Sequence, residues 1–246
     1  MELELYTLVA LFGVALIAGF IDAIAGGGGL LTVPALLATG MPPALVLGTN
    51  KLQSSFGSFS ATWFYARKGL LEWAIIWPAV ICTFIGAAIG TLAVQTIDAA
   101  ILERLLPFLL MAFACYFYFS PRVSDAESQR RLTPMLFALL VGGGVGFYDG
   151  FFGPGTGSMF IIAFHYLLRM DLVSSSANSK TFNFASNIGA LVAFVIAAVV
   201  TPPDVISQLA LAVPMCLLDE LGILGAHWFI KSSAKPEDDP EKESAV

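Results

Sequence analysis

The sequence predicts an all-α, polytopic membrane protein made of two inverted repeats, each with a broken helical hairpin plus transmembrane helices. Three observations predict it: the composition, the recurrence of long apolar segments, and similar motifs in the two halves. The 246 residues are 57% hydrophobic and 12% charged, whereas soluble domains are about 45–50% apolar and about 25% charged. So little charge cannot coat a water-soluble globule, which argues against a soluble enzyme, a nucleic-acid-binding protein or a disordered scaffold.

Seven segments are apolar and long enough to cross a bilayer, which takes about 20 residues in a helix. They are 5–24, 44–66, 73–94, 99–119, 134–152, 174–200 and 205–230. The apolar stretches 30–39 and 158–168 are too short, and each follows a glycine-rich break, GGGG and GPGTG respectively. We therefore expect two hairpins, 5–40 and 134–170, whose tips lie within the membrane.

The basic residues support this folding of the chain, because Lys and Arg concentrate on the cytoplasmic side of membrane proteins. If both hairpins return to the side on which they began, most loop bases fall on one face. These bases are Arg67, Lys68, Arg122, Arg130, Arg131, Arg169, Lys231 and Lys235. If each hairpin were instead one broken span, Arg169 would change sides. The distribution favours the hairpins.

The second half of the chain resembles the first. GFIDAIAGGGG aligns with GFYDGFFGPGTG and pairs Asp22 with Asp149, while NKLQSSFGSFSA aligns with SKTFNFASNIGA and pairs Lys51 with Lys180. Three expected crossings separate the two copies, so the second copy is upside down relative to the first. Inverted repeats with interrupted helices are typical of secondary transporters, whose binding site lies where the copies meet.

Three motifs, GFIDAIAGGGGLLTVPALL, GTNKLQ and GFYDGFFGPGTGS, together resemble the TauE/SafE family of sulfite exporter-like membrane permeases over about residues 16–200. The resemblance implies a multi-pass transporter of the bacterial cell inner membrane. Its expected substrates are small sulfur-containing anions such as sulfite, sulfoacetate or other organosulfonates. With the repeats, it favours ion-gradient-coupled transport by alternating access and no enzymatic activity. An anion channel of similar build is the alternative.

The C-terminal part departs from the family, which normally ends with one more membrane helix matching 99–119. Here 205–230 contains Asp219, Glu220 and His227, and the chain becomes polar at Ser232. A C-terminally truncated partial permease is therefore a further alternative. The expected division is a first repeat at 1–120, a cytoplasmic loop at 121–133, a second repeat at 134–231 that lacks its final helix, and a disordered acidic tail at 232–246.

The glycine-rich breaks are candidate anion-binding elements. In lipid, unwound backbone persists only against protein or water. Consecutive glycines leave amides uncovered, and the helix that follows directs its positive end at the break, which attracts an anion. The alternative is close helix packing through small residues, which is also what we expect of Gly142 to Gly144 and Gly146. The candidate substrate-binding glycines are Gly26, Gly27, Gly28, Gly29, Gly153, Gly155 and Gly157.

Lys51 and Lys180 are the bases that lie inside apolar segments away from a cytoplasmic end. Lys51 lies about 24 Å from Arg67 along a helix that rises about 1.5 Å per residue, and snorkelling to the nearer surface is the alternative role. An ammonium group beside amide donors suits a sulfonate or sulfite oxyanion. We expect each lysine to attract the anion, one nearer each face, with Asn50, Gln53, Asn178, Asn183 and Asn187 as polar partners.

Asp22 and Asp149 end the first helix of each hairpin, directly before the glycines. An acid buried beside a basic site can carry a coupling proton or balance charge. It can equally cap backbone amides at the break. The sequence leaves both roles open for both residues.

No cofactor or metal is expected. The cysteines Cys82, Cys115 and Cys216 stand alone without a CxxC pair or a Cys/His cluster, so a metal site has no support. The GxG patterns follow no strand, which argues against nucleotide binding. The expected partners are a small anionic substrate and the lipid bilayer, with no nucleic acid; a homo-oligomer stays open.

Overall fold

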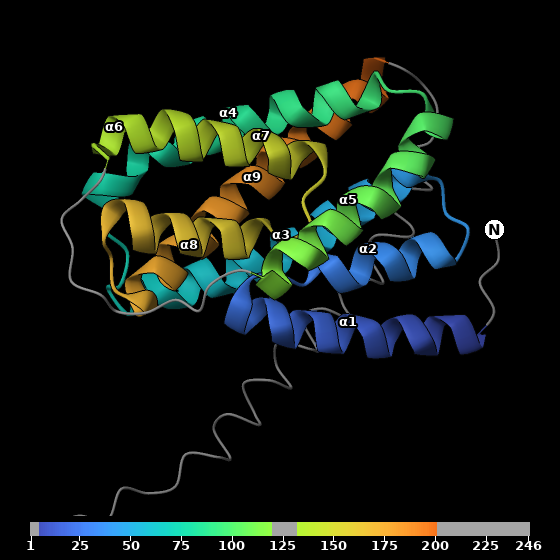
Figure 1. Cartoon of the computed structure of the whole chain (residues 1–246), viewed down its shortest axis with the longest axis horizontal. Helices are drawn as coiled ribbons and strands as arrows, with labels where there is room; N and C mark the ends of the chain where they lie inside the picture. The colour runs from blue at the N-terminus through green and yellow to red at the C-terminus, as the bar shows by residue number, and fades with distance from the viewer. Residues whose placement is uncertain (1–4, 120–131, 201–246) are drawn as a thin grey trace, which may run out of the picture.

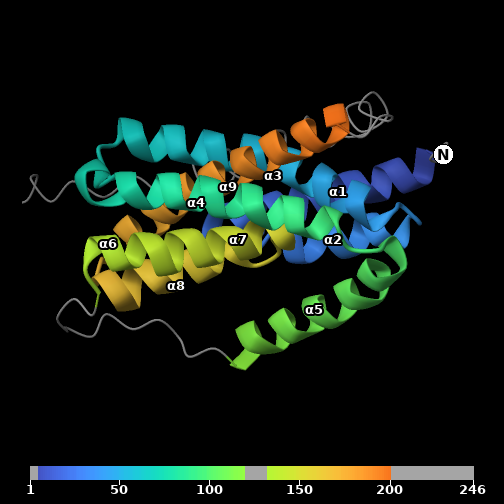
Figure 2. The same ribbon diagram turned by 90° about the horizontal axis from the view of Figure 1, so that it is seen from above.

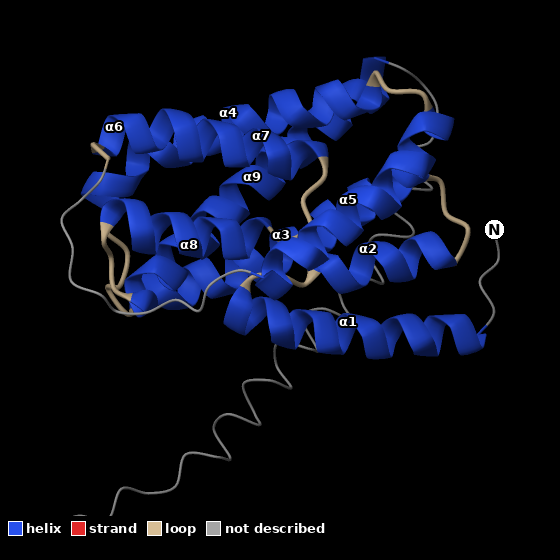
Figure 3. Ribbon diagram, in the orientation of Figure 1, coloured by secondary structure: helices blue, strands red, loops and turns tan. Residues whose placement is uncertain are grey.

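The computed structural model describes residues 5–119 and 132–200, and within these ranges all regular structure is helical (Figure 3). The all-α prediction is therefore confirmed. The predicted helix 205–230, the tail 232–246 and nearly all of the loop 121–133 lie outside the described residues.

Within each half of the chain, the helices follow one another with short connections. The first half contains α1 (Leu5–Ala25), α2 (Gly29–Ala38), α3 (Pro43–Arg67), α4 (Trp73–Gln95) and α5 (Ala99–Phe119). The second contains α6 (Pro134–Phe137), the π-helical turn η1 (Ala138–Gly143), α7 (Gly144–Phe151), α8 (Thr156–Leu168) and α9 (Leu172–Val200). The segments α6, η1 and α7 run on without a break. Apolar length alone therefore located the helices well, while the division into two repeats stays a prediction.

Within residues 5–119 and 132–200, five helical segments are long and apolar enough to cross a membrane. They are Leu5–Ile24, Ile76–Gln95, Ala99–Tyr116, Pro134–Phe151 and Leu172–Ala198. Helix α3, which we also expected to span, has 25 residues but is not among the five. Its polar residues lower its hydropathy, and many of them, including Asn50, Lys51 and Gln53, are buried in the protein. Burial of these polar side chains against other helices makes α3 compatible with a bilayer.

Helix α4 packs along both α9 and the continuous segment η1–α7 (Figures 1 and 2). Glycines allow this close approach, since a Cβ at Gly142 or Gly146 would lie 2.8 or 2.7 Å from a backbone oxygen of α4. A Cβ at Gly143 or Gly144 would meet nothing within 4 Å. The expected close helix contact is therefore confirmed at Gly142 and Gly146. Gly143 takes part through its backbone oxygen, with which a Cβ on Gly86 of α4 would clash, whereas the space beside Gly144 is open.

An aromatic cluster fixes one end of the bundle. Phe137, Phe160, Phe164 and Phe182 are at most 1% exposed and come from α6, α8 and α9. The rings of Phe164 and Phe182 lie 4.8 Å apart in an edge-to-face arrangement, which aromatic pairs favour. This cluster holds α8 against α9.

Asp171 caps the N-terminus of α9, and we expect Asp171→Ala to destabilise the protein by about 1 kcal/mol. Its Oδ1 accepts hydrogen bonds from the backbone amides of Val173 at 2.9 Å and Ser174 at 3.0 Å. Hydrogen bonds from the side chain and backbone of Ser174 hold the pKa of this carboxyl below its ordinary value. The pKa of Asp171 is lower in the folded state than in the unfolded state. The ionised cap therefore stabilises the protein above about pH 4, and this stabilisation is lost as the pH falls below that value.

Thermal unfolding of the detergent-solubilised protein at pH 7 and pH 3 checks this cap. The difference between wild type and Asp171→Ala should be clear at pH 7 and shrink at pH 3. Asp171→Asn keeps an acceptor oxygen without the charge, so it should be intermediate at pH 7. Equal unfolding temperatures at pH 7 would contradict the capping role.

Candidate functional site

The two glycine-rich breaks meet in the interior. The Ser158 amide, after the second break, donates a hydrogen bond of 3.1 Å to the carbonyl oxygen of Gly26 in the first. A Cβ on Gly26 would lie 2.7 Å from the backbone of Gly157, and Gly26 has a φ of +75° that other residues rarely adopt. The tips of the two hairpins therefore touch through bare backbone.

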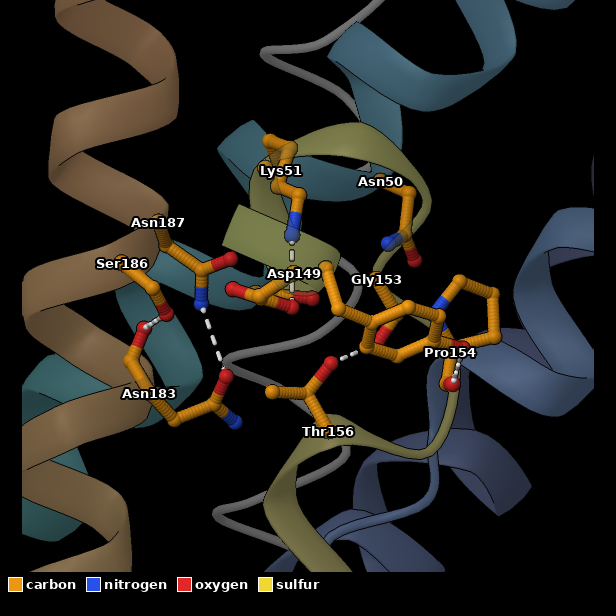
Figure 4. A network of polar contacts seen from close by, with 12 residues as sticks. Asn50, Lys51, Asp149, Gly153, Pro154, Thr156, Asn183, Ser186 and Asn187 are labelled. Carbon is orange, nitrogen blue, oxygen red and sulfur yellow. Dashed lines mark hydrogen bonds and ion pairs between the residues drawn. The ribbon is translucent and has the colours of Figure 1, made fainter. Parts of the chain in front are cut away.

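A buried ion pair lies beside this junction. Lys51 Nζ, from the middle of α3, is 2.7 Å from Asp149 Oδ1 near the end of α7, and both side chains are 2% exposed (Figure 4). A Cβ at Gly153 would lie 2.7 Å from Lys51 Nζ. The second break thus needs glycine at this position to leave room for the ammonium group.

The second oxygen of Asp149 lacks a partner. Asp149 Oδ2 is buried and accepts no hydrogen bond from any residue in the described ranges. Figure 4 shows the side chains of Asn183 and Asn187, which come from α9, beside Asp149. Their mutual hydrogen bond is long, 3.4 Å between Asn187 Nδ2 and Asn183 Oδ1. The site therefore holds an unsatisfied carboxylate oxygen with loosely bonded amides nearby.

A second pair, Lys180–Asp22, repeats the combination with different geometry. Lys180 Nζ donates to the backbone oxygen of Asp22 and lies 3.5 Å from its Oδ2. Asp22 Oδ1 accepts a 3.1 Å hydrogen bond from the Gly28 amide, and the Asp22 side chain is 29% exposed. Asp22 therefore caps an amide of the break, which is one of its two expected roles. Each pair joins a lysine from one predicted repeat to an aspartate from the other.

A cavity opens between the breaks and the Lys51–Asp149 pair. It has an empty volume of about 250 Å³, which includes space open to the outside. Its lining is almost entirely polar side chains and glycine backbone. The lining residues are Asp22, Gly26, Gly29, Asn50, Lys51, Ser54, Asp149, Gly153, Gly155, Thr156, Gly157, Asn183 and Asn187. Lys51 is the one base among them.

Five predicted site residues do not line this cavity: Gly27, Gly28, Gln53, Asn178 and Lys180. Asn178 has another use, since its Oδ1 accepts a 3.3 Å hydrogen bond from the Glu72 amide just before α4, and its Nδ2 donates to the Ser174 oxygen. The lining thus combines residues from both breaks, α3 and α9, but it includes one of the two lysines rather than both.

Ser54 and Thr156 line the cavity but were not among the predicted site residues. Ser54 follows Lys51 by three residues, as Asn183 follows Lys180, so both lie on the same helix face as their lysine. The alignment of the two repeats pairs Ser54 with Asn183 and would have added it. Thr156 has no such signal beyond its place within the second break.

The chemistry of the lining suits a small anion better than a metal. In the part of the chain that the structure describes, no three His, Cys, Asp or Glu side chains form a group that could hold a metal ion. Lys51 and the amides of Asn50, Asn183 and Asn187 are hydrogen-bond donors. The carboxylate of Asp149 already occupies Lys51, so an anion must compete with it for the ammonium group.

Comparisons with known proteins identify the family. A family model described as "Sulfite exporter TauE/SafE" matches residues 11–235. A "Probable membrane transporter protein" of Haemophilus influenzae is 48% identical over 196 residues, which is 80% of this chain and 77% of the relative. The "Probable membrane transporter protein YfcA" of Escherichia coli K12 is 46% identical over 186 residues, 76% of this chain and 69% of the relative.

A shorter match has a different name. The "Sec-independent protein translocase protein TatC" of Haemophilus influenzae is 54% identical over 54 residues, 22% of this chain and 18% of the relative. No solved structure matches the chain.

Proposed function

Because the chain belongs to the sulfite exporter TauE/SafE family of membrane transporters, we propose that it is a secondary transporter of small sulfur-containing anions in the bacterial cell inner membrane. Sulfite, sulfoacetate and other organosulfonates are the proposed substrates. The observation that carries the proposal is a lysine, Lys51, buried beside the meeting point of two unwound backbone segments. Buried ionisable groups in membrane helices characteristically mark substrate or ion pathways.

The proposed binding mode uses the donors around the cavity. The Lys51 ammonium group contacts an oxygen of the sulfite or sulfonate group, since charge-assisted hydrogen bonds to anionic oxygens are short and strong. The amides of Asn50, Asn183 and Asn187 complete the coordination. The backbone amides at the start of α2 and α8 add the positive ends of two helix dipoles.

The charge of Asp149 opposes this binding mode. Two like charges about 4 Å apart repel by about 4 kcal/mol at an effective dielectric constant of about 20. An anion therefore binds well only when Asp149 loses its charge or moves away from Lys51. Binding and the Lys51–Asp149 contact thus exclude each other, which is what a coupled transporter requires.

The two ion pairs also suggest how the site is exposed in turn to each side of the membrane. Lys51–Asp149 and Lys180–Asp22 both connect the first half of the chain to the second. In the proposed cycle, the halves rock against each other about these contacts, as expected for inverted repeats with interrupted helices. The substrate anion replaces the Asp149 carboxylate at Lys51 and so weakens the contact between the two halves of the chain.

Transport by the purified full-length chain in proteoliposomes tests the proposal. Radiolabelled sulfite, sulfate, sulfoacetate and methanesulfonate are offered separately, with and without a proton gradient, and protein-free liposomes are the control. We expect uphill accumulation of at least one sulfite or sulfonate that stops when an uncoupler collapses the gradient. Downhill flux without accumulation would favour the anion channel instead, and no flux of any of the four anions would overturn the proposal.

A further inference from the structure

The two aligned acids differ in ways that the repeat does not predict. Asp22 is 29% exposed, lies 3.5 Å from the Lys180 ammonium group, and has its Oδ1 occupied by the Gly28 amide. Asp149 is 2% exposed and pairs with Lys51 at 2.7 Å. Equivalent positions in the sequence therefore have unequal surroundings.

The hydrogen bonding of Asp149 is incomplete. Its Oδ2 is buried without a hydrogen-bond partner among the described residues, although buried carboxylate oxygens are almost always satisfied. Asp149 also lines the cavity. An unpartnered oxygen beside a small polar space is where a proton can add without breaking an existing hydrogen bond, and a protonated carboxyl gains an O–H donor.

Few other groups near Asp149 can titrate. On its own helix, Tyr148 donates its hydroxyl to the Pro154 oxygen at 2.8 Å. Among the neighbouring described helices, α3 supplies Lys51, α1 supplies Asp22 across the cavity, and α4 supplies Cys82, which packs against the aromatic cluster. Two further titratable groups, Lys180 of α9 and His165 of α8, contact the Asp22 and Met170 backbone oxygens respectively.

We propose that Asp149 is the proton-binding residue that couples one proton to each transported anion, whereas Asp22 is a permanent cap of the first break. This inference rests on the proposed function and names the co-transported ion and its site. A proton from water adds to the Asp149 carboxylate, the Lys51 ammonium group is released from that carboxylate, and an oxygen of the anion accepts its hydrogen bond. The Lys51–Asp149 site is neutral before the exchange and neutral after it, so no net charge is buried.

Proton uptake on substrate binding tests this directly. The purified full-length protein is titrated with methanesulfonate in weakly buffered, sodium-free solution containing a pH-indicator dye. Methanesulfonate stays a monoanion throughout the neutral range, so any proton taken up is bound by the protein. We expect an uptake of up to about one proton per anion bound, and an affinity for the anion that falls as the pH rises, by up to about tenfold per pH unit.

Asp149→Asn and Asp22→Asn are a matched pair of variants. The amide introduced by Asp149→Asn mimics the protonated acid, so this variant should bind methanesulfonate with an affinity independent of pH and without proton uptake. In proteoliposomes it should exchange anions across the membrane but no longer accumulate them in response to a proton gradient. Asp22→Asn keeps an acceptor for the Gly28 amide and should retain proton uptake upon binding.

Several results would overturn the inference. The first two are anion binding by the wild type without proton uptake and unchanged proton uptake in Asp149→Asn. The others are loss of proton uptake in an Asp22→Asn protein that still binds the anion, and a requirement for sodium. Each of these results would still be compatible with anion transport by the protein. Failure of the wild type to bind or transport any of the sulfur-containing anions would instead overturn the proposed function, so the two failures are distinguishable.

Discussion

Replacing Lys51 with glutamine is expected to lower anion transport per folded molecule by about a hundredfold, which corresponds to the loss of one charged hydrogen bond. Lys51 is the one base that lines the cavity in the described part of the chain. The same change removes the ion-pair partner of Asp149, whose side chain is 2% exposed. Leaving such a charge unpaired costs about 3–5 kcal/mol, so the yield of folded protein should fall as well.

The double variant Lys51→Gln/Asp149→Asn separates these two effects. It removes both charges, so the folded yield, measured by fluorescence-detected size-exclusion chromatography, should recover towards that of the wild type. Uptake of labelled anion per folded molecule should stay low. A double variant that transports like the wild type would show that Lys51 serves stability alone. Lys180→Gln is the comparison in the other pair, and its main effect should be on folded yield because Lys180 does not line the cavity.

Gly150→Ala is expected to destabilise the bundle by about 1–3 kcal/mol or more, as overpacking of a tight interface does. A methyl group there would overlap the backbone oxygen of Ala87 in α4. Neither backbone can move to relieve this overlap without separating α4 from α7. Close packing through small residues is a main source of helix association in membranes. The unfolding temperature in detergent measures the effect.

Gly143→Ala is the matched control for the glycine interface. Gly143 belongs to the same continuous helical segment, but a Cβ there meets nothing within 4 Å. Alanine favours a helix over glycine by about 1 kcal/mol, so this variant should be as stable as the wild type or slightly more stable. If both substitutions lower the unfolding temperature equally, close approach is not what makes Gly150 necessary.

The helices were predictable because apolar length is a local property. Segments as different as 5–24 and 99–119 needed only the requirement that a helix cross about 30 Å of hydrocarbon. The polar run around Lys51 was also conspicuous, since a base inside an apolar segment needs a partner. What the sequence could not provide was the partner, because Asp149 lies on a helix that begins far along the chain.

The candidate site differs from the expectation in its symmetry. Aligned residues predicted two equivalent lysines, yet Lys51 lines the cavity and Lys180 holds the end of α1. Asn178 could not be distinguished from Asn183 by residue type, although the first ties α9 to the start of α4. Side-chain direction depends on how the helices rotate against one another, and this rotation is set by contacts between segments that are far apart in the sequence.

The reciprocal pairing of the two halves has a consequence for biogenesis. Asp22 and Lys180 are 158 positions apart in the chain, and ribosomes add about 5–20 residues per second. Asp22 is therefore translated roughly 8–30 s before Lys180. During that interval the nascent chain must shelter Asp22 and Lys51 in water, in the insertion machinery or against a chaperone, so that integration of the early helices is completed only after synthesis of the late ones.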